Sequence, residues 1–324
     1  TYTANAAGLL TSPGSCRGRM DLYPDNQAHT LALTGAAQLP MKTHFMGTVS
    51  YGWRLQNDSF LPGTINSAVN GGAPLRISNS SLNGDVRPLM VNATLTNNAI
   101  DHLNLKAFYR FYDLANYSRK VTLTYGWVVN DAGARQDVGE KLSLRSYSKN
   151  TVGFEAGYDV TRWLAAKFAA GYERLHRADT DVNAPTVNNS NEFTVGPTFD
   201  LKPLPWTLFR LAYKHSWRDA PNYDQLDKKF FEAKRSRGRV SLFSEITPSE
   251  TLSLHAGFEF TGETYPGTTL GTQNDFNYSP SIGLVYAPAE WIKFFADYNW
   301  DRSDWKLDAR ATITNSATAW TSRG

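Results

Sequence analysis

Apolar and polar side chains alternate along this chain, and that alternation constrains the fold more than any other feature. Between positions 45 and 55 the odd residues are apolar, aromatic or glycine, whereas the even residues are mostly small or polar. Because successive side chains of a β-strand point to opposite faces of its sheet, the pattern predicts a strand with one apolar and one polar face. Each run has about nine to eleven residues, the length that a tilted strand needs to cross a lipid bilayer.

The same alternation recurs along most of the chain. Clear runs lie at 103–111, 152–158, 164–172, 193–201, 252–260 and 292–300. We count about twelve strands in six hairpins between residues 28 and 302, and a further candidate strand at 305–313. Residues 121–129 alternate as well, and they either extend a hairpin above the membrane or form an additional strand.

The connections between these strands alternate between short and long. Short turns are expected near 40–42, 97–101, 159–162, 202–205, 247–250 and 287–290, and long loops near 56–88, 113–145, 175–190, 218–236 and 263–275. Outer-membrane barrels have this asymmetry, with short periplasmic turns and long extracellular loops. Trp163, Trp206 and Trp291 directly follow three of the short turns, where amphipathic aromatics favour the membrane interface.

Composition excludes two other classes of protein. No window approaches the roughly 20 consecutive apolar residues of a membrane helix, and a net charge of +3 is too even to indicate nucleic-acid binding. A soluble all-β protein also alternates, but its strands usually have about five to six residues. We therefore predict an all-β fold, a large transmembrane antiparallel β-barrel in the outer membrane of a Gram-negative bacterium, with residues 1–324 forming one domain.

The chain carries no recognisable catalytic or metal-binding motif. Its six histidines are scattered without metal-ligand spacing, and its single cysteine, Cys16, can form no internal disulfide. Motifs for haem attachment, nucleotide binding or serine hydrolysis are missing. The basic run at 228–239 is interleaved with acidic residues, which favours a solvated loop. We predict a protein that is not an enzyme and that binds no cofactor or metal itself.

The polar face of the predicted strands is the candidate functional surface. It carries charges of both signs, which indicates no strong ion selectivity, and small residues that leave room for water or for a protein plug. The residues expected to face the lumen are Thr48, Ser50, Arg54, Lys106, Arg110, Glu155, Lys167, Glu173, Lys214, His255, Glu259, Lys293 and Asp297.

Four segments resemble the MtrB/PioB family, the outer-membrane barrels that sheath decahaem cytochromes. They are RMDLYPDNQAH at 19–29, GTVSYGW at 47–53 followed by QNDSFLP at 56–62, YRFYDLAN at 109–116 and YDQLDKKFFEAKRSRGRV at 223–240. The last is the most specific, and the order and spacing of the segments fit the family. Family members are longer and have more strands, so the resemblance implies that this chain is a portion of a larger barrel.

The resemblance also implies a function. A periplasmic multihaem c-type cytochrome would be inserted through the barrel, which insulates it from lipid and docks an outer multihaem cytochrome at its mouth. The haem c would belong to the partner, the lumen-facing residues named above would contact it, and the 218–239 loop would shape the mouth. The complex would be a conduit for extracellular electron transfer.

Two other functions are compatible with the pattern of residues. A diffusion porin or substrate channel would hold only water and its own loops in the lumen. An outer-membrane hydrolase would need a constellation of catalytic residues near the mouth, and no motif supports one.

Overall fold

The described part of the chain folds mainly into antiparallel β-strands. The computed structural model describes residues 2–4, 10–13, 23–60, 79–119, 121–129, 135–141, 144–179, 188–221, 232–310 and 319–323. Within them, no helix is long and apolar enough to span a membrane. The strands are β1 (Tyr2–Ala4), β2 (Leu10–Pro13), β3 (Gln27–Leu39), β4 (Thr43–Gln56), β5 (Gly84–Asn97), β6 (Leu103–Asn116), β7 (Thr122–Val129), β8 (Arg135–Lys141), β9 (Arg145–Thr161), β10 (Leu164–Asp179), β11 (Asn189–Leu201), β12 (Thr207–Asp219), β13 (Arg235–Ser249), β14 (Leu252–Thr264), β15 (Gly271–Ala289), β16 (Ile292–Asn299), β17 (Arg302–Arg310) and β18 (Ala319–Arg323).

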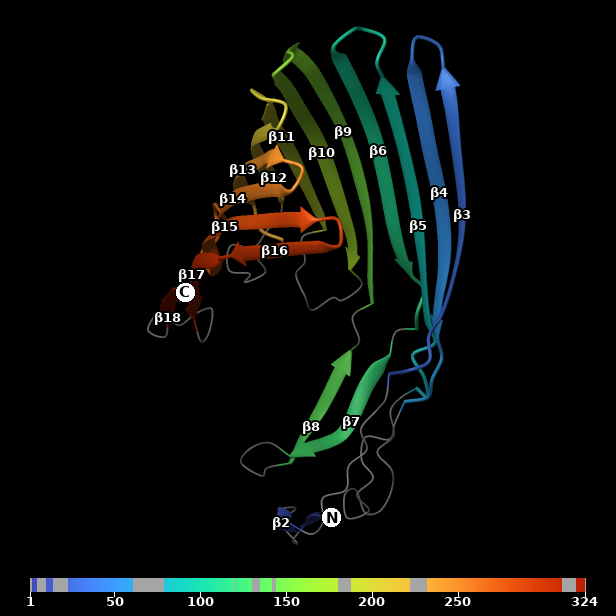
Figure 1. Ribbon diagram of the computed structural model, residues 1–324. Coiled ribbons are helices and arrows are strands. Elements are labelled where there is room, and N and C mark those ends of the chain that lie inside the picture. The colour runs from blue at the N-terminus through green and yellow to red at the C-terminus, as the bar shows by residue number, and fades with distance from the viewer. Residues whose placement is uncertain are drawn as a thin grey trace.

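One curved sheet contains 14 of these strands (Figure 1). Its order follows the chain from β3 to β6 and from β9 to β15, with β6 paired to β9, β16 and β17 both paired to β15, and β18 paired to β17. This up-and-down order is the predicted one. Strands β7 and β8 pair only with each other, so residues 121–129 belong to a hairpin outside the main sheet. Within the described residues the sheet is open, because β3 and β18 lie at its opposite edges.

The last predicted strands need a correction. The candidate strand at 305–313 is not a separate neighbour, because β16 and β17 both pair with β15, one after the other. The ladder is interrupted where Trp300 donates its N–H to the carbonyl oxygen of Pro280, which has no N–H to return. Counting β16 and β17 as one interrupted strand leaves twelve long strands, as the alternation predicts, followed by the short β18.

The strands are staggered in the way that a barrel requires. The cross-strand row that starts at Thr207, the first residue of β12, passes Leu254, the third residue of β14. It then reaches Ala296, the fifth residue of β16. Each row therefore climbs away from the short turns as it crosses the sheet, and such a stagger accompanies strands that tilt relative to the barrel axis.

The short turns are tight, and neighbouring turns are joined by hydrogen bonds. Met41 and Lys42, between β3 and β4, have φ of 59° and 50°, which is the left-handed conformation of a tight turn. The side-chain Nδ2 of Asn97, at the end of β5, donates a hydrogen bond to the backbone carbonyl oxygen of Met41 at 2.9 Å. The opposite ends of the strands carry the long loops, and the β7–β8 hairpin projects beyond them (Figure 1).

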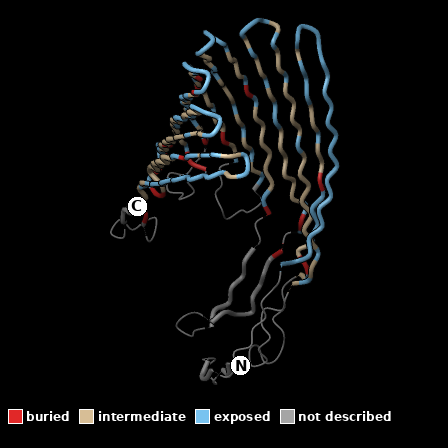
Figure 2. The backbone as a smooth tube through the Cα atoms, in the orientation of Figure 1, coloured by how far each residue is buried: buried red, intermediate tan, exposed pale blue. Residues whose placement is uncertain are grey.

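Among the residues that the structure describes, no second layer covers the sheet. The buried hydrophobic residues among those described are few: Val121, Leu144, Ala220, Ala233, Tyr265, Leu270 and Ala309. Large apolar side chains along the strands are instead exposed, with Phe154 44%, Phe168 48% and Phe193 47% exposed. Figure 2 shows that most of the sheet is coloured as exposed or intermediate and little of it as buried. A soluble sheet buries its apolar face against another element. An apolar face exposed over so many strands indicates contact with a membrane or with a partner.

Candidate functional site: the polar face of the sheet

All thirteen residues predicted to face the lumen lie on one face of the sheet. Cross-strand partners share a face, and the register links β4 to β16 without changing sides. For example, Arg110 is opposite Thr151, which is opposite Glu173. Lys106 is opposite Glu155, and Asp297 and His255 are both opposite Gly283. We call this surface the polar face and the opposite surface the apolar face.

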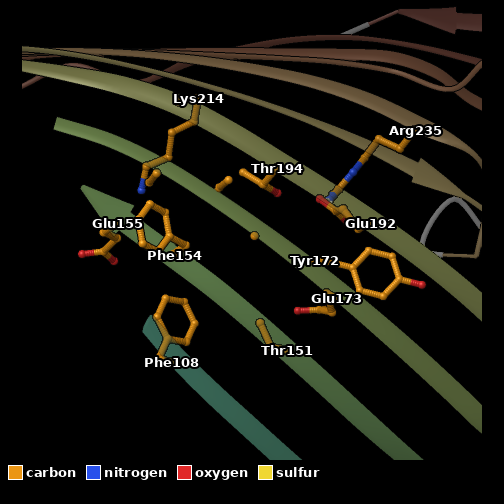
Figure 3. Close-up of a pocket in the computed structure, with 14 residues that line it drawn as sticks. Phe108, Thr151, Phe154, Glu155, Tyr172, Glu173, Glu192, Thr194, Lys214 and Arg235 are labelled. Atoms are coloured by element: carbon orange, nitrogen blue, oxygen red, sulfur yellow. Dashed lines mark hydrogen bonds and ion pairs between the residues drawn. The ribbon is translucent and has the colours of Figure 1, made fainter. Parts of the chain in front are cut away.

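The polar face is hollowed in its middle. A recess of about 380 Å³ is lined by residues of β6 and of β9 to β13 (Figure 3), and an adjoining one of about 640 Å³ runs toward the short turns. On the same face the side chains of His255 and Asp297 meet across the strand between them, as they can on the concave side of a curved sheet. Its floor is made of residues with very small side chains: Gly157, Ala165, Ala169, Gly171 and Gly196.

Ion pairs between neighbouring strands surround this recess. Lys106 bonds Glu155 at 3.2 Å, and Lys149 bonds Glu173 at 2.7 Å. Arg210 and Lys167 both hold Asp200, at 2.5 and 3.1 Å. The Asp200 side chain is only 10% exposed, whereas those of its two cations are 46% and 54% exposed. The charges of this face therefore neutralise one another across strands while most of them remain accessible.

Phe108 is an aromatic residue on the polar face, and the structure explains its presence. Its ring covers Gly153 on the next strand, where a Cβ would collide with it. The guanidinium of Arg110 lies 4.8 Å from the centre of the ring and the ammonium of Lys106 5.5 Å. Cation–π contact of this kind stabilises an aromatic ring in a polar setting.

A second network of charges lies at the long-loop end of the polar face. Arg235 bonds Glu192 at 2.8 Å (Figure 3) and approaches Glu263 at 3.5 Å, and Arg237 bonds Glu263 at 3.1 Å. The side chains of Arg235, Glu192 and Glu263 are 15%, 20% and 13% exposed. Tyr265, just beyond β14, donates its hydroxyl to Glu263 at 2.5 Å, and burial raises the pKa of that hydroxyl.

This network corrects the prediction of a solvated basic loop at 228–239. Arg235, Arg237 and Arg239 are alternate residues of β13, and carboxylates of neighbouring strands pair with all three. The spacing of two between these arginines is typical of one face of a strand. The concentration of charged residues instead favoured a loop in the sequence analysis. Residues 222–231, which hold most of the family-like segment before this strand, lie outside the described residues, as does Cys16.

His255 and Asp297 meet across a strand that separates them. Both are opposite Gly283, and His255 Nε2 lies 2.9 Å from Asp297 Oδ1. A Cβ at Gly283 would overlap both side chains. The alternation predicts that each residue is on the polar face, but it does not reveal their contact, because it does not set the register of three strands.

The remaining predicted residues are less constrained. Thr48 bonds Thr34 at 3.0 Å, and Glu259 pairs with Arg239. Within the described residues, Arg54, Lys214 and Lys293 form no ion pair. Over the same residues, no three His, Cys, Asp or Glu side chains gather closely enough to hold a metal ion.

Comparison with solved structures returns outer-membrane proteins with little sequence identity. The outer-membrane expressed OmpT of Vibrio cholerae is 15% identical with a TM-score of 0.36, over 82% of this chain and 89% of that one. The in-vitro folded trimer form of OmpT is 12% identical with a TM-score of 0.37, over 85% and 93%. Among curated proteins, none matches.

The model of one protein family matches residues 2–323, and its members are described as outer membrane beta-barrel porins, MtrB/PioB. That description agrees with the two-faced, staggered antiparallel sheet found here. It also agrees with the four segments that resemble the family in sequence. The chain belongs to the MtrB/PioB family of outer-membrane β-barrel porins.

Proposed function

We propose that this barrel is a non-catalytic scaffold that sheaths a multihaem c-type cytochrome and so forms a conduit for extracellular electron transfer. The haem belongs to the partner, and this chain binds none. The observation that carries the proposal is the concave polar face, with its floor of small residues and its compensated charges, on the inside of a wall whose outside is apolar.

The chemistry of the polar face suits a protein in the lumen. Cations and anions alternate across neighbouring strands, as in the pairs Lys106–Glu155 and Lys167–Asp200, so no single sign of charge dominates the recess. Protein interfaces are built from such mixed polar contacts with complementary charges. The small residues Ala169, Gly171 and Gly196 let a partner approach the backbone of the wall.

The width of the wall supports the same proposal. The diameter of a β-barrel grows with its number of strands, and barrels of about eight strands are filled by their own side chains. Here twelve long strands curve without bringing the two edges of the sheet together (Figure 1). A barrel that includes this wall has a lumen wide enough for a folded partner.

The apolar face supplies insulation. Lipid in contact with Phe154, Phe168 and Phe193 forms a medium of low dielectric constant around the lumen, in which charge is strongly disfavoured. Trp163, Trp206 and Trp291 are 44%, 43% and 84% exposed at the short turns, and we place them at the periplasmic interface. The long-loop end then forms the extracellular mouth, where an outer multihaem cytochrome would dock.

An absorption spectrum tests the proposal directly. The protein is purified in mild detergent from native outer membranes and its visible spectrum is recorded. A stoichiometric c-type haem signal, carried by a second polypeptide, is the expected result. A colourless preparation that opens ion-conducting pores in a planar bilayer would contradict the sheath and leave a diffusion porin.

A further inference from the structure

The apolar face has a defined upper edge. Tyr172 in β10 lies nine positions after Trp163 at the short turn. At about 3.3 Å per residue, this separation is roughly 30 Å along the strand. With a tilt of about 40°, this corresponds to a height of roughly 23 Å. The apolar band of an outer-membrane barrel is about 25 Å tall, with aromatic residues at both edges. Tyr172 therefore marks the extracellular edge of the band.

Two tyrosine–asparagine bonds trace that edge across neighbouring strands. Tyr109 donates its hydroxyl to Asn150 Oδ1 at 2.8 Å, and Tyr172 donates to Asn191 Oδ1 at 2.9 Å. In each pair the tyrosine ring belongs to the apolar band. The asparagine lies on the neighbouring strand, one cross-strand row closer to the long loops. Since the amide oxygens accept these bonds, and no other hydrogen bond of either side chain is found within the described residues, the Nδ2 donors of both asparagines remain available.

Arg174 lies between these two asparagines. It is opposite Asn150 on one side and Asn191 on the other, two residues above Tyr172. Its side chain is exposed, and within the described residues it forms no ion pair. Two other arginines of the same face each hold a carboxylate: Arg87 with Asp85 at 2.7 Å and Arg302 with Asp304 at 3.0 Å.

We propose that Arg174, Asn150 and Asn191 bind the phosphate of a lipid in the outer leaflet. A guanidinium flanked by two amide donors matches the several acceptor oxygens of a phosphate. The site lies just above the apolar band, where the phosphates of lipid headgroups are found, and it faces away from the lumen. The neighbouring carboxylate of Asp219 does not compete, because Lys234 holds it at 3.1 Å.

The test measures lipid binding by native mass spectrometry. The full protein is purified in dodecyl maltoside and supplied with bisphosphorylated lipid A or with the same lipid after removal of its phosphates. Wild type is expected to bind the phosphorylated lipid at least tenfold more tightly. Arg174→Gln is expected to lose about tenfold of that affinity, and Arg174→Lys less.

Arg302→Gln is the matched control, because Arg302 lies on the same face and its charge is already paired. It should bind lipid A as wild type does. A heat-modifiability gel shows whether each variant is folded. If a variant does not fold, the comparison of the two lipids on the wild-type protein still tests the proposal. Equal binding of the two lipids, no loss in Arg174→Gln, or full displacement by an equal concentration of inorganic phosphate would each overturn a lipid-phosphate site.

Discussion

The polar face has two unlike halves. On β3, β4 and β5 it consists mainly of alanine, glycine, hydroxyl, amide and apolar side chains together with His44, and Arg54 is the one Lys, Arg, Asp or Glu that those three strands direct to it. On β6 and from β9 to β14 it carries the ion pairs and the recess. We call these halves the neutral wall and the charged wall.

The difference shows how one regular sheet can have two roles, with the neutral wall lining the lumen and the charged wall providing a docking surface. The backbone ladder is the same in both walls, so the neutral wall does not need its side chains to hold the strands together. In the charged wall the side chains add contacts between strands and at the same time shape the recess. A partner in the lumen is therefore expected to bind the charged wall more closely than the neutral wall.

The largest effect is expected from filling the recess. Ala169 faces the recess from the floor of the charged wall, whereas Ala170, its neighbour in β10, has its side chain on the apolar face. Under the proposed function, Ala169→Trp should reduce haem recovered per barrel by about tenfold to a hundredfold, since overpacking a fitted surface costs about 1–3 kcal/mol. Ala170→Trp, against lipid, should leave recovery unchanged.

The neutral wall provides a second control. Thr94 lies on the polar face of β5, so Thr94→Trp places the same final side chain on the neutral wall. Haem recovery in Thr94→Trp should fall less than in Ala169→Trp. Equal losses in these two variants would show that the partner contacts both walls alike and would remove the distinction between them.

The next effect concerns stability and compares two glycines. A Cβ at Gly196 in β11 would overlap the carbonyl oxygen of Tyr213 in the paired strand, which can move only if the backbone moves. Gly196→Ala should therefore lower the free energy of unfolding by about 1–2 kcal/mol, measured by urea titration in lipid vesicles. Gly35 in β3 has no atom within 4 Å of such a Cβ, so Gly35→Ala should be neutral or slightly stabilising. Equal effects would show that β11 is not closely packed on β12.

The sequence predicts the two faces well because alternation is a local property. Each strand needs only its own residues to show which side is apolar, so all thirteen predicted residues lie together once the strands pair. The strand count follows in the same way. The break between β16 and β17 was not visible in the sequence. It lies opposite Pro280 of β15, and only the pairing of the strands shows which residue faces this proline.

The contacts within the polar face could not be predicted, because they depend on register. Asp200 meets Lys167 from one neighbouring strand and Arg210 from the other, and a shift of two residues in either pairing would separate them. The network of Arg235, Glu192 and Glu263 joins residues far apart in the chain. Its usable signal was the period of two in Arg235, Arg237 and Arg239.

A smaller effect is expected at the buried carboxylate of the charged wall. Asp200→Asn leaves Lys167 and Arg210 without their shared anion. Since both cations are about half exposed, water compensates much of the loss, and we expect a decrease of about 1 kcal/mol in the free energy of unfolding. Glu259→Gln, which removes the partner of Arg239 from an exposed pair, should change it by less than about 0.5 kcal/mol. The same urea titration compares the two variants, and the reverse order would mean that burial does not govern these pairs.

The smallest effect is expected in the neutral wall, where Thr34 and Thr48 share an exposed hydrogen bond of 3.0 Å. Water can replace each hydroxyl's partner, so Thr48→Ala should change the free energy of unfolding by less than about 0.5 kcal/mol. The double variant with Thr34→Ala measures the coupling between the two hydroxyls, which should also be below about 0.5 kcal/mol. A coupling above about 1 kcal/mol would show that side chains hold the strands of the neutral wall together as they do in the charged wall. The two halves would then differ in charge alone.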